Sequence, residues 1–150
     1  MNIHWYYKAF DELTPNELYR IMQLRSEVFV VEQNCVFLDA DNNDQQCLHF
    51  MGWAQDDLAA YTRIAPPGYI YKETSIGRVA TSPAYRKKGL GRELMLQSLE
   101  VCRLHFPKTD IKLGAQYYLK HFYASLGFIA VGDTYIEDGI KHIYMLLPGK

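Results

Sequence analysis

The 150-residue sequence contains only three cysteines, and no two of them form a Cys-x-x-Cys pair. Cys35, Cys47 and Cys102 are odd in number and widely spaced, which speaks against a disulfide framework and favours a reducing compartment. No stretch approaches the roughly 20 apolar residues that a membrane helix needs, and the first residues lack the apolar core of a signal peptide. We therefore predict a cytoplasmic protein that does not span a membrane.

An excess of either charge is also missing. Sixteen Lys and Arg stand against 17 Asp and Glu, so the formal net charge is −1. A general nucleic-acid or membrane-surface binder would show a broad basic excess, so we expect neither partner. Apolar residues make up 49% of the chain. At this length they can form one core, and we predict a single domain over residues 1–150 without a disulfide or metal staple.

The hydrophobic pattern predicts a mixed α/β domain. Thr14, Pro15 and Glu17 form a helix start with a capping box, and Gly127 is expected to end a later helix. Helices are expected over residues 15–30, 90–106 and 117–126, and strands over 3–8, 48–54, 58–64, 74–81, 110–115, 128–131 and 141–147. The element order is β-α-β-β-β-α-β-α-β-β, and the second and third strands are expected to form a hairpin.

The most informative segment is residues 76–92, a strand followed by a turn and an Arg-x-x-Gly-x-Gly motif at the start of a long helix. The first N–H groups of a helix have no internal partner and, with the helix dipole, form an anion site. Gly89 and Gly91 would allow a ligand to approach closely. Four cations lie here: Arg86, Lys87, Lys88 and Arg92. A pyrophosphate is the expected ligand, and a Gly-rich turn beside a solvated basic face is the alternative.

About 30 residues further on, the chain reads Phe122-Tyr123-x-x-x-Gly127-Phe128. These two motifs, in an element order that also agrees, resemble the GCN5-related N-acetyltransferase (GNAT) superfamily. Segments 24–35, 114–116 and 137–145 resemble its ElaA-like branch, so the resemblance covers nearly the whole chain. It implies the GNAT fold: a central mixed, mostly antiparallel sheet with two splayed parallel strands and flanking helices.

The resemblance implies acetyl-CoA or CoA as the cofactor, bound where strands 74–81 and 110–115 part. Backbone groups of Val79, Ala80 and Thr81 would pair with the pantetheine, and the Val79 N–H would polarise the thioester carbonyl. Gln116, where many relatives carry asparagine, would be a further contact. The pyrophosphate would lie among Arg86, Lys87, Lys88, Gly89, Leu90, Gly91 and Arg92.

The resemblance also implies direct transfer of the acetyl group to a primary amine in a ternary complex. Tyr123 occupies the usual acid position, and an unperturbed tyrosine titrates near about pH 10, so its proton would be available to the leaving thiolate. Glu32 and His142 are the expected bases, since one carboxylate lies before the acceptor-side loop and a histidine ordinarily titrates near about pH 6.5. For each residue a structural role is the alternative. Glu137, Asp138 and His49 are further base candidates.

Several other features have plainer interpretations. Asp39-x-Asp41-x-Asn43 opens like a calcium loop, but Asp44 and Phe50 stand where that loop needs Gly and Glu, so we reject it. Cys47 and His49 are expected in the core or a loop rather than at a metal. Cys35 is expected to be a packing residue, because acetyl transfer in this superfamily normally proceeds without an acyl-enzyme.

The acceptor cannot be read from the sequence beyond a small-molecule or peptide amine. A non-catalytic CoA-binding or interaction module of the same fold is the alternative function, and a homodimer through an edge strand is expected only by analogy. Outside the four cations near residues 86–92, the chain carries 12 positive against 17 negative charges. That split suggests a cationic acceptor.

Overall fold

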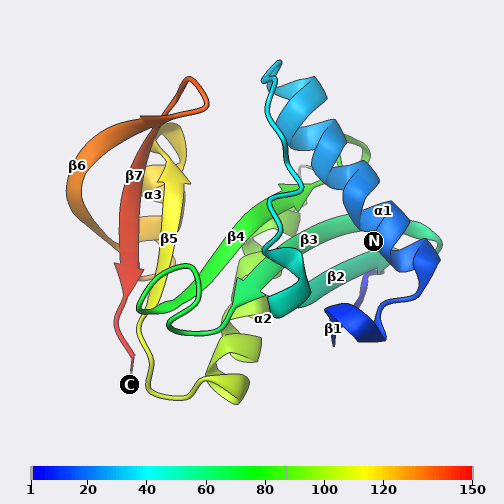
Figure 1. Cartoon of the computed structure of the whole chain (residues 1–150), viewed down its shortest axis with the longest axis horizontal. Helices are drawn as coiled ribbons and strands as arrows, with labels where there is room; N and C mark the ends of the chain where they lie inside the picture. The colour runs from blue at the N-terminus through cyan, green and yellow to red at the C-terminus, as the bar shows by residue number, and fades with distance from the viewer. Residues whose placement is uncertain (1, 87, 150) are drawn as a thin grey trace.

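The computed structural model describes residues 2–86 and 88–149. One seven-stranded sheet runs through it in the order β1-β2-β3-β4-β5-β7-β6 (Figure 1). The strands are β1 His4–Ala9, β2 Leu48–Ala54, β3 Asp57–Ala65, β4 Thr74–Thr81, β5 Ile111–Gln116, β6 Ile129–Glu137 and β7 Ile140–Leu147. The helices are α1 Pro15–Arg25, α2 Leu90–His105 and α3 Lys120–Ala124. The predicted order of elements is confirmed.

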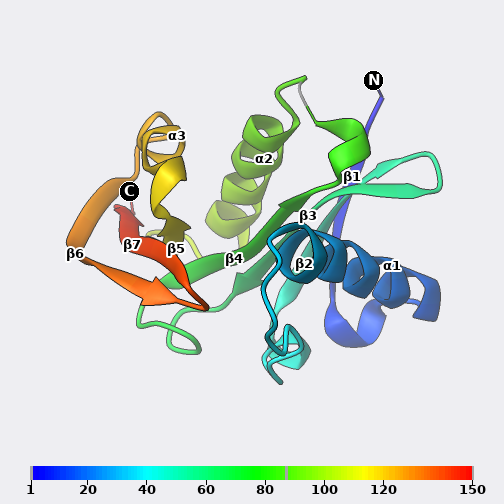
Figure 2. The same cartoon turned by 90° about the horizontal axis from the view of Figure 1, so that it is seen from above.

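Helices α1 and α2 cover opposite faces of the sheet, as Figure 2 shows. Alternate residues of a strand point to opposite faces. Met51 of β2 packs with Ile21 of α1, whereas its neighbour Phe50 packs in the core that contains Leu94 of α2. The alternation of apolar residues along β2 and β3 therefore supplies two cores, one on each side.

The predicted helix boundaries rest on local chemistry that the structure contains. The Thr14 hydroxyl accepts from the Glu17 N–H at 3.1 Å, and the Glu17 carboxylate accepts from the Thr14 N–H at 2.8 Å. Pro15 is the first residue of α1. Gly127 has a φ of 102°, a left-handed conformation that favours glycine after a helix.

Three elements differ from the prediction. The helix expected over residues 117–126 is a 3-10 turn over Tyr117–Leu119 followed by α3, which ends at Ala124. The first helix changes at Ser26 into a π-helical segment that ends at Glu32, and such wide turns often occur at functional sites. Strand β6 runs to Glu137, whereas 128–131 was expected. Gly132, Asp133 and Thr134 suggest a turn by composition, but the register shift between Val131 and Tyr135 marks an irregularity within a continuing strand.

Strands β4 and β5 are the parallel pair, and they are paired only at Thr74–Ile111 and Ser75–Lys112. Beyond Ser75 they diverge, so the splayed parallel strands expected from the resemblance are confirmed. Part of the divergence coincides with a bulge in β4. Tyr61 of β3 pairs with Ala80 and Arg63 pairs with Gly77, so Arg78 and Val79 together face one residue of β3.

Within the described residues, no helix is long and apolar enough to cross a membrane.

Candidate functional site

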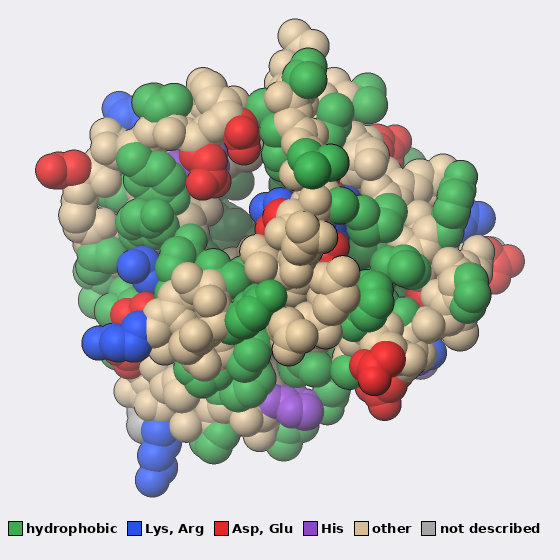
Figure 3. Space-filling model, viewed as in Figure 1, with side chains coloured by type: hydrophobic (Ala, Val, Ile, Leu, Met, Phe, Trp, Pro, Cys, Tyr) green, Lys and Arg blue, Asp and Glu red, His purple; other side chains and the backbone are tan. Residues whose placement is uncertain are grey.

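A cleft of about 840 Å³ opens where β4 and β5 part. In the space-filling view of Figure 3 a hollow is visible between the part of the molecule that carries β5–β7 and the part that carries α1. The lining comes from the end of the π-helical segment, β4, the start of α2, β5, the α3 region and the β6–β7 hairpin. Predicted site residues in the lining are Glu32, Val79, Thr81, Arg86, Gly91, Gln116, Tyr123 and His142.

Other predicted site residues do not line this cleft. Ala80 and Leu90 are each 2% exposed and pack in the cores. Arg92 donates to the Ser125 hydroxyl at 3.0 Å, and Lys88 and Gly89 precede α2 outside the lining. Lys87 lies outside the described residues. A wider depression of about 1230 Å³ beside α1 and β1 contains none of the predicted residues.

The start of α2 has room for a ligand. Gly89 precedes the helix with a φ of 71°, which favours glycine. Among the described residues, and apart from the chain neighbours and the helix's own backbone, no atom lies within 4 Å of where a Cβ would stand on Gly89 or Gly91. The N–H groups of the first helical turn have no partner within the helix. These features fit an anionic group such as a pyrophosphate.

The β4 bulge is held by ion pairs. Arg78 has a φ of 49°, a conformation that side-chain-bearing residues rarely adopt. Its Nε donates to Asp39 Oδ1 at 2.8 Å, and its Nη2 donates to the Asp39 carbonyl at 2.9 Å. The second Asp39 carboxylate oxygen accepts from Arg25 Nε at 2.8 Å, and Arg25 is fully buried. A strained point of β4 is thus tied to the loop that follows the first helix.

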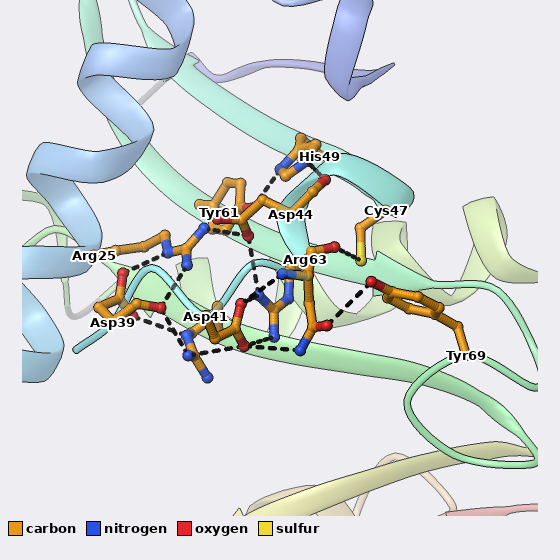
Figure 4. Close-up of polar contacts among 11 residues, drawn as sticks. Arg25, Asp39, Asp41, Asp44, Cys47, His49, Tyr61, Arg63 and Tyr69 are labelled. Atoms are coloured by element: carbon orange, nitrogen blue, oxygen red, sulfur yellow. Dashed lines mark hydrogen bonds and ion pairs between the residues drawn. The ribbon is translucent and has the colours of Figure 1, made fainter. Parts of the chain in front are cut away.

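The calcium-like loop is occupied by arginines of the protein itself (Figure 4). Asp41 accepts from Arg63 at 2.8 and 2.9 Å, and Asp44 accepts from both Arg25 and Arg63 at 2.8 and 2.9 Å. Burial pushes the pKa of Asp41 upward, but the hydrogen bonds from Arg63 outweigh it and hold the pKa well below its usual range. The loop therefore forms a rigid, charge-balanced wall beside the cleft.

His49 belongs to this buried network and lies outside the cleft. It is fully buried, and its Nε2 lies 2.9 Å from the Asp44 carbonyl while its Nδ1 lies 2.6 Å from the Tyr61 hydroxyl. A carbonyl can only accept, so Nε2 carries the proton and Nδ1 accepts from Tyr61. Burial lowers the pKa of His49. Both ring nitrogens of His49 are thus occupied away from the cleft, so this residue has a structural role and is not placed to act as a base.

Glu32 and Arg86 both line the cleft and form a bidentate ion pair. Arg86 Nη1 and Nη2 donate to the two Glu32 oxygens at 2.6 and 2.8 Å, and Nη2 also donates to the Thr81 carbonyl at 2.9 Å. The hydrogen bond from Arg86 lowers the pKa of Glu32. A carboxylate whose charge is already stabilised in this way takes up a proton less readily.

Tyr123 lies deep in the cleft. It is 5% exposed, and its ring packs against Phe122 and Phe128 at centroid distances of 5.1 and 6.0 Å. Burial, and secondarily Tyr118, raise the pKa of Tyr123. Its hydroxyl makes no hydrogen bond with another residue described by the structure. The phenol thus keeps its proton and has a free donor at the cleft.

His142 lies on β7 and also lines the cleft. Its Nδ1 lies 2.7 Å from the Ile140 carbonyl, so this nitrogen carries the proton of the neutral ring and Nε2 retains a lone pair. The ring stacks on Tyr135 at 5.5 Å and 23°. In the sheet His142 pairs with Gln116 of β5 on one side and Tyr135 of β6 on the other.

Tyrosines that the sequence did not single out complete the β7 side of the cleft. A Cβ at Gly114 would lie 2.5 Å from the Tyr135 hydroxyl, so any side chain there would have to displace the Tyr135 ring. Tyr135 stacks on Tyr144 at 4.5 Å, and Tyr71 meets Tyr144 edge-on at 5.7 Å. Burial, with Tyr144 and Glu137 nearby, raises the pKa of Tyr71 to about 12. Period-two spacing would have revealed Tyr135 if β6 had been extended past residue 131.

Cys35 is half-buried at the cleft rim, and its Sγ donates to the Asp138 carbonyl at 3.2 Å. This contact joins the segment after the π-helical turn to the β6–β7 hairpin, which lie on opposite sides of the cleft. Cys47 is buried, as expected.

Comparisons with known proteins agree with this architecture. Residues 13–147 match the family described as acetyltransferase (GNAT) domain. ElaA of Escherichia coli is 44% identical over 145 residues, which cover 95% of each chain. The crystal structure of ElaA has a TM-score of 0.91, with 97% of this chain and 99% of that chain covered.

Two solved structures extend the comparison. An acyl-CoA N-acyltransferase from Pseudomonas aeruginosa has a TM-score of 0.94 at 39% identity, covering 97% of this chain and 99% of that one. A GNAT family acetyltransferase from Elizabethkingia anophelis, with acetyl-CoA bound, has a TM-score of 0.70 at 13% identity, covering 98% of each. The latter similarity concerns the fold alone.

Proposed function

The chain belongs to the GNAT acetyltransferase family, and from this we propose that it transfers an acetyl group from acetyl-CoA to a primary amine. The resemblance of its sequence to the family and to ElaA is confirmed by the comparisons. One observation carries the proposal: a single cleft is lined by the part of β4 that no longer pairs with β5, by Gly91 at the start of α2 and by Tyr123, whose hydroxyl has no partner among the described residues. The cytoplasmic location and the homodimer stay predictions from sequence.

The residues present fit acetyl-CoA. Beyond Ser75 the β4 backbone has no strand partner on its β5 side, so the main-chain groups of Val79, Ala80 and Thr81 that face this gap can pair with the amides of a pantetheine arm. The open helix start at Gly89 and Gly91 can hold the pyrophosphate. When bound, acetyl-CoA supplies an acetyl group activated as a thioester.

We assign to the Val79 N–H, which lies in the β4 bulge, a hydrogen bond to the carbonyl oxygen of the acetyl group. Bulges redirect the backbone groups beside them, and Val79 lines the cleft directly after the strained Arg78. A fixed N–H that donates to the carbonyl oxygen stabilises the negative charge that develops there, without any reorganisation during the reaction.

His142 is the better base of the two expected candidates. Glu32 is held ionised by Arg86, which weakens it as a proton acceptor. His142 offers an Nε2 lone pair in its neutral form, and its ring is fixed by the Ile140 carbonyl and by Tyr135. We assign to His142 the removal of the amine proton and to Glu32 the orientation of Arg86.

Tyr123 acts as a hydrogen-bond donor to the sulfur. A thiol of ordinary reactivity titrates near about pH 8.5, well below a tyrosine with a raised pKa, so complete transfer of the phenol proton to the thiolate is unfavourable. Donation of a hydrogen bond stabilises the charge on the sulfur while the proton stays on Tyr123.

The reaction balances with these assignments. The C–N bond forms as the amine nitrogen attacks the acetyl carbon, and the C–S bond breaks with its electron pair moving to sulfur. The amine proton passes to His142 and from there to solvent, and the thiolate leaves or takes a proton from solvent. No acyl-enzyme is needed.

The test is the release of thiol from acetyl-CoA with a panel of primary amines. The proposal expects turnover that His142→Gln reduces by about a hundredfold and that Glu32→Gln reduces much less. Tight acetyl-CoA binding with no turnover on any amine or peptide would instead indicate the non-catalytic module. A larger loss in Glu32→Gln than in His142→Gln would reverse the assignment of the base.

A further inference from the structure

One face of β5, β7 and β6 lines the cleft in ordered rows. His142 pairs with Tyr135 across the β6–β7 ladder, and Ile140 pairs with Glu137 two residues further along. Side chains two residues apart on a strand share a face, and all four residues line the cleft. The His142 row is therefore the inner row of this wall, and the Glu137 row is the outer one, beside the hairpin turn at Asp138.

The charges of the cleft lining are paired except at the outer row. Arg63 forms an ion pair with Asp41, and Arg78 forms one with Asp39, both in the calcium-like loop. Arg86 forms an ion pair with Glu32. Glu137 and Asp138 also line the cleft, and neither forms a salt bridge with a residue that the structure describes. Figure 3 shows acidic side chains beside the hollow. The rim thus presents uncompensated negative charge.

A second, independent feature is a pair of polar side-chain atoms without partners at the inner end of the cleft. Tyr123 and His142 are 5% and 8% exposed, and both line the cleft. The Tyr123 hydroxyl and the His142 Nε2 have no hydrogen-bond partner among residues 2–86 and 88–149. Among the described residues, the fully enclosed polar side-chain atoms without a partner are Trp53 Nε1 and Arg63 Nε. The Tyr123 hydroxyl and His142 Nε2 are therefore open to the cleft, where a ligand atom can reach them. The His142 Nε2 therefore marks a position where a polar atom of the acceptor completes its hydrogen bonding, while the Tyr123 hydroxyl is left for the thioester sulfur.

The distance along the strands between the His142 row and the Glu137 row sets the expected separation between the two polar ends of a ligand. Two residues along a strand span about 6.5–7 Å, which is the separation that four or five methylene groups give two amines in an extended chain. The side chains around this path include Ile70, Tyr71, Tyr135 and Ile140, whose apolar and aromatic surfaces suit methylene groups.

We propose that the acceptor is a short aliphatic diamine, with one amine at His142 and the second, as an ammonium, at Glu137 and Asp138. This inference rests on the proposed function, because it names the substrate class of the same site. The carboxylates are exposed, so each is expected to contribute a modest preference that added salt weakens.

The experiment compares 1,4-diaminobutane with 1-aminobutane, which has the same carbon chain and one charge. Binding to the CoA-loaded protein is measured by calorimetry, and acetylation is measured by thiol release. We expect the wild type to bind the diamine about tenfold more tightly, and Glu137→Gln to reduce this ratio to about threefold, the scale of exposed ion pairs. The affinity for 1-aminobutane is expected to stay unchanged.

Two further variants make the result specific. Asp138→Asn keeps a residue type that tolerates the φ of 51° at this position, and it should lower the ratio as Glu137→Gln does. Asp133→Asn lies on the same strand but outside the cleft lining, and it should leave the ratio at its wild-type value.

The outcomes separate this inference from the proposed function. Equal affinity for the two amines in the wild type, or an unchanged ratio in the Glu137→Gln, Asp138→Asn double variant, would overturn the diamine assignment, even if both amines are acetylated. A diamine preference that depends on Glu137, without acetylation of either amine, would support the diamine site and defeat the proposed acetyl transfer.

Discussion

The Arg78 Nε lies 2.8 Å from Oδ1 of Asp39, and through this ion pair the loop after the first helix holds the one bulge of β4 beside the cleft. Asp39 is 6% exposed and is shared with the buried Arg25. Arg78 itself has a left-handed backbone with a φ of 49°. The ion pair therefore stabilises a conformation that costs the backbone about 1–2 kcal/mol.

This arrangement predicts different effects for two substitutions of Arg78. Arg78→Ala loses the charged hydrogen bonds to Asp39 and keeps the strain, so the free energy of unfolding should fall by about 2 kcal/mol. Arg78→Gly loses the same bonds but relieves the strain, so it should be about 1 kcal/mol more stable than Arg78→Ala. Urea unfolding of the two variants measures the difference. Equal stability would mean that the backbone at Arg78 is unstrained.

Gly91→Ala should separate cofactor binding from folding. Within the part of the chain that the structure describes, no atom beyond the chain neighbours and the helix backbone lies within 4 Å of a Cβ at this position. Alanine is also the better helix former, so stability should hold or rise by about 0.5 kcal/mol. The added methyl group would narrow the space at the start of α2, and acetyl-CoA affinity should fall about tenfold, or about 1.4 kcal/mol. Calorimetry with acetyl-CoA, and Glu100→Ala on the same helix as the control, test this. Unchanged affinity would place the pyrophosphate elsewhere.

Tyr123→Phe should lower turnover without lowering stability. The residue is 5% exposed and its hydroxyl has no partner among the described residues, so its removal leaves no other described group unsatisfied. We expect kcat to fall about a hundredfold, the scale of losing one hydrogen bond to a developing charge, with an unchanged or higher melting temperature and unchanged acetyl-CoA affinity. Tyr117→Phe, in the same segment but outside the cleft lining, is the matched control. Full activity of Tyr123→Phe would remove Tyr123 from the mechanism.

Glu17 should make the fold sensitive to acid. Burial pushes its pKa upward, but hydrogen bonds from Lys8, the Thr14 N–H and Tyr6 outweigh this and lower the pKa from 4.5 to about 2. A carboxylate with a depressed pKa in the folded state stabilises the protein above its unfolded pKa, and this stability is lost as the pH falls from about 4.5 to about 2.

Glu17→Gln should therefore destabilise the protein by about 2–3 kcal/mol at pH 7 and by much less near pH 2. Glu100→Gln is the control, because its ion pair with Arg103 is exposed and should contribute almost nothing. Chemical unfolding across this pH range measures both. A Glu17→Gln effect that stays constant with pH would contradict the role of the ionised carboxylate.

Local chemistry made the elements predictable from the sequence. The capping box of Thr14 and Glu17 and the left-handed Gly127 depend on residues a few positions apart, so their patterns are visible in the chain. The prediction ends β6 at residue 131 because Gly132 and its neighbours have the composition of a turn. In the structure, pairing with β7 keeps the strand extended to Glu137. Tertiary hydrogen bonding outweighed local preference there.

Short-range spacing and motifs were enough to predict the order of elements, which is confirmed, and to select Gly91 and Tyr123, which both line the cleft. The pairing of Glu32 with Arg86, 54 residues away, and of Arg78 with Asp39, 39 residues away, is visible only in the folded chain. Charged groups pair with whichever partners the sheet register and the loops bring within reach, and that register is set by burial across the whole domain. Neighbouring residues therefore carry no information about these partners.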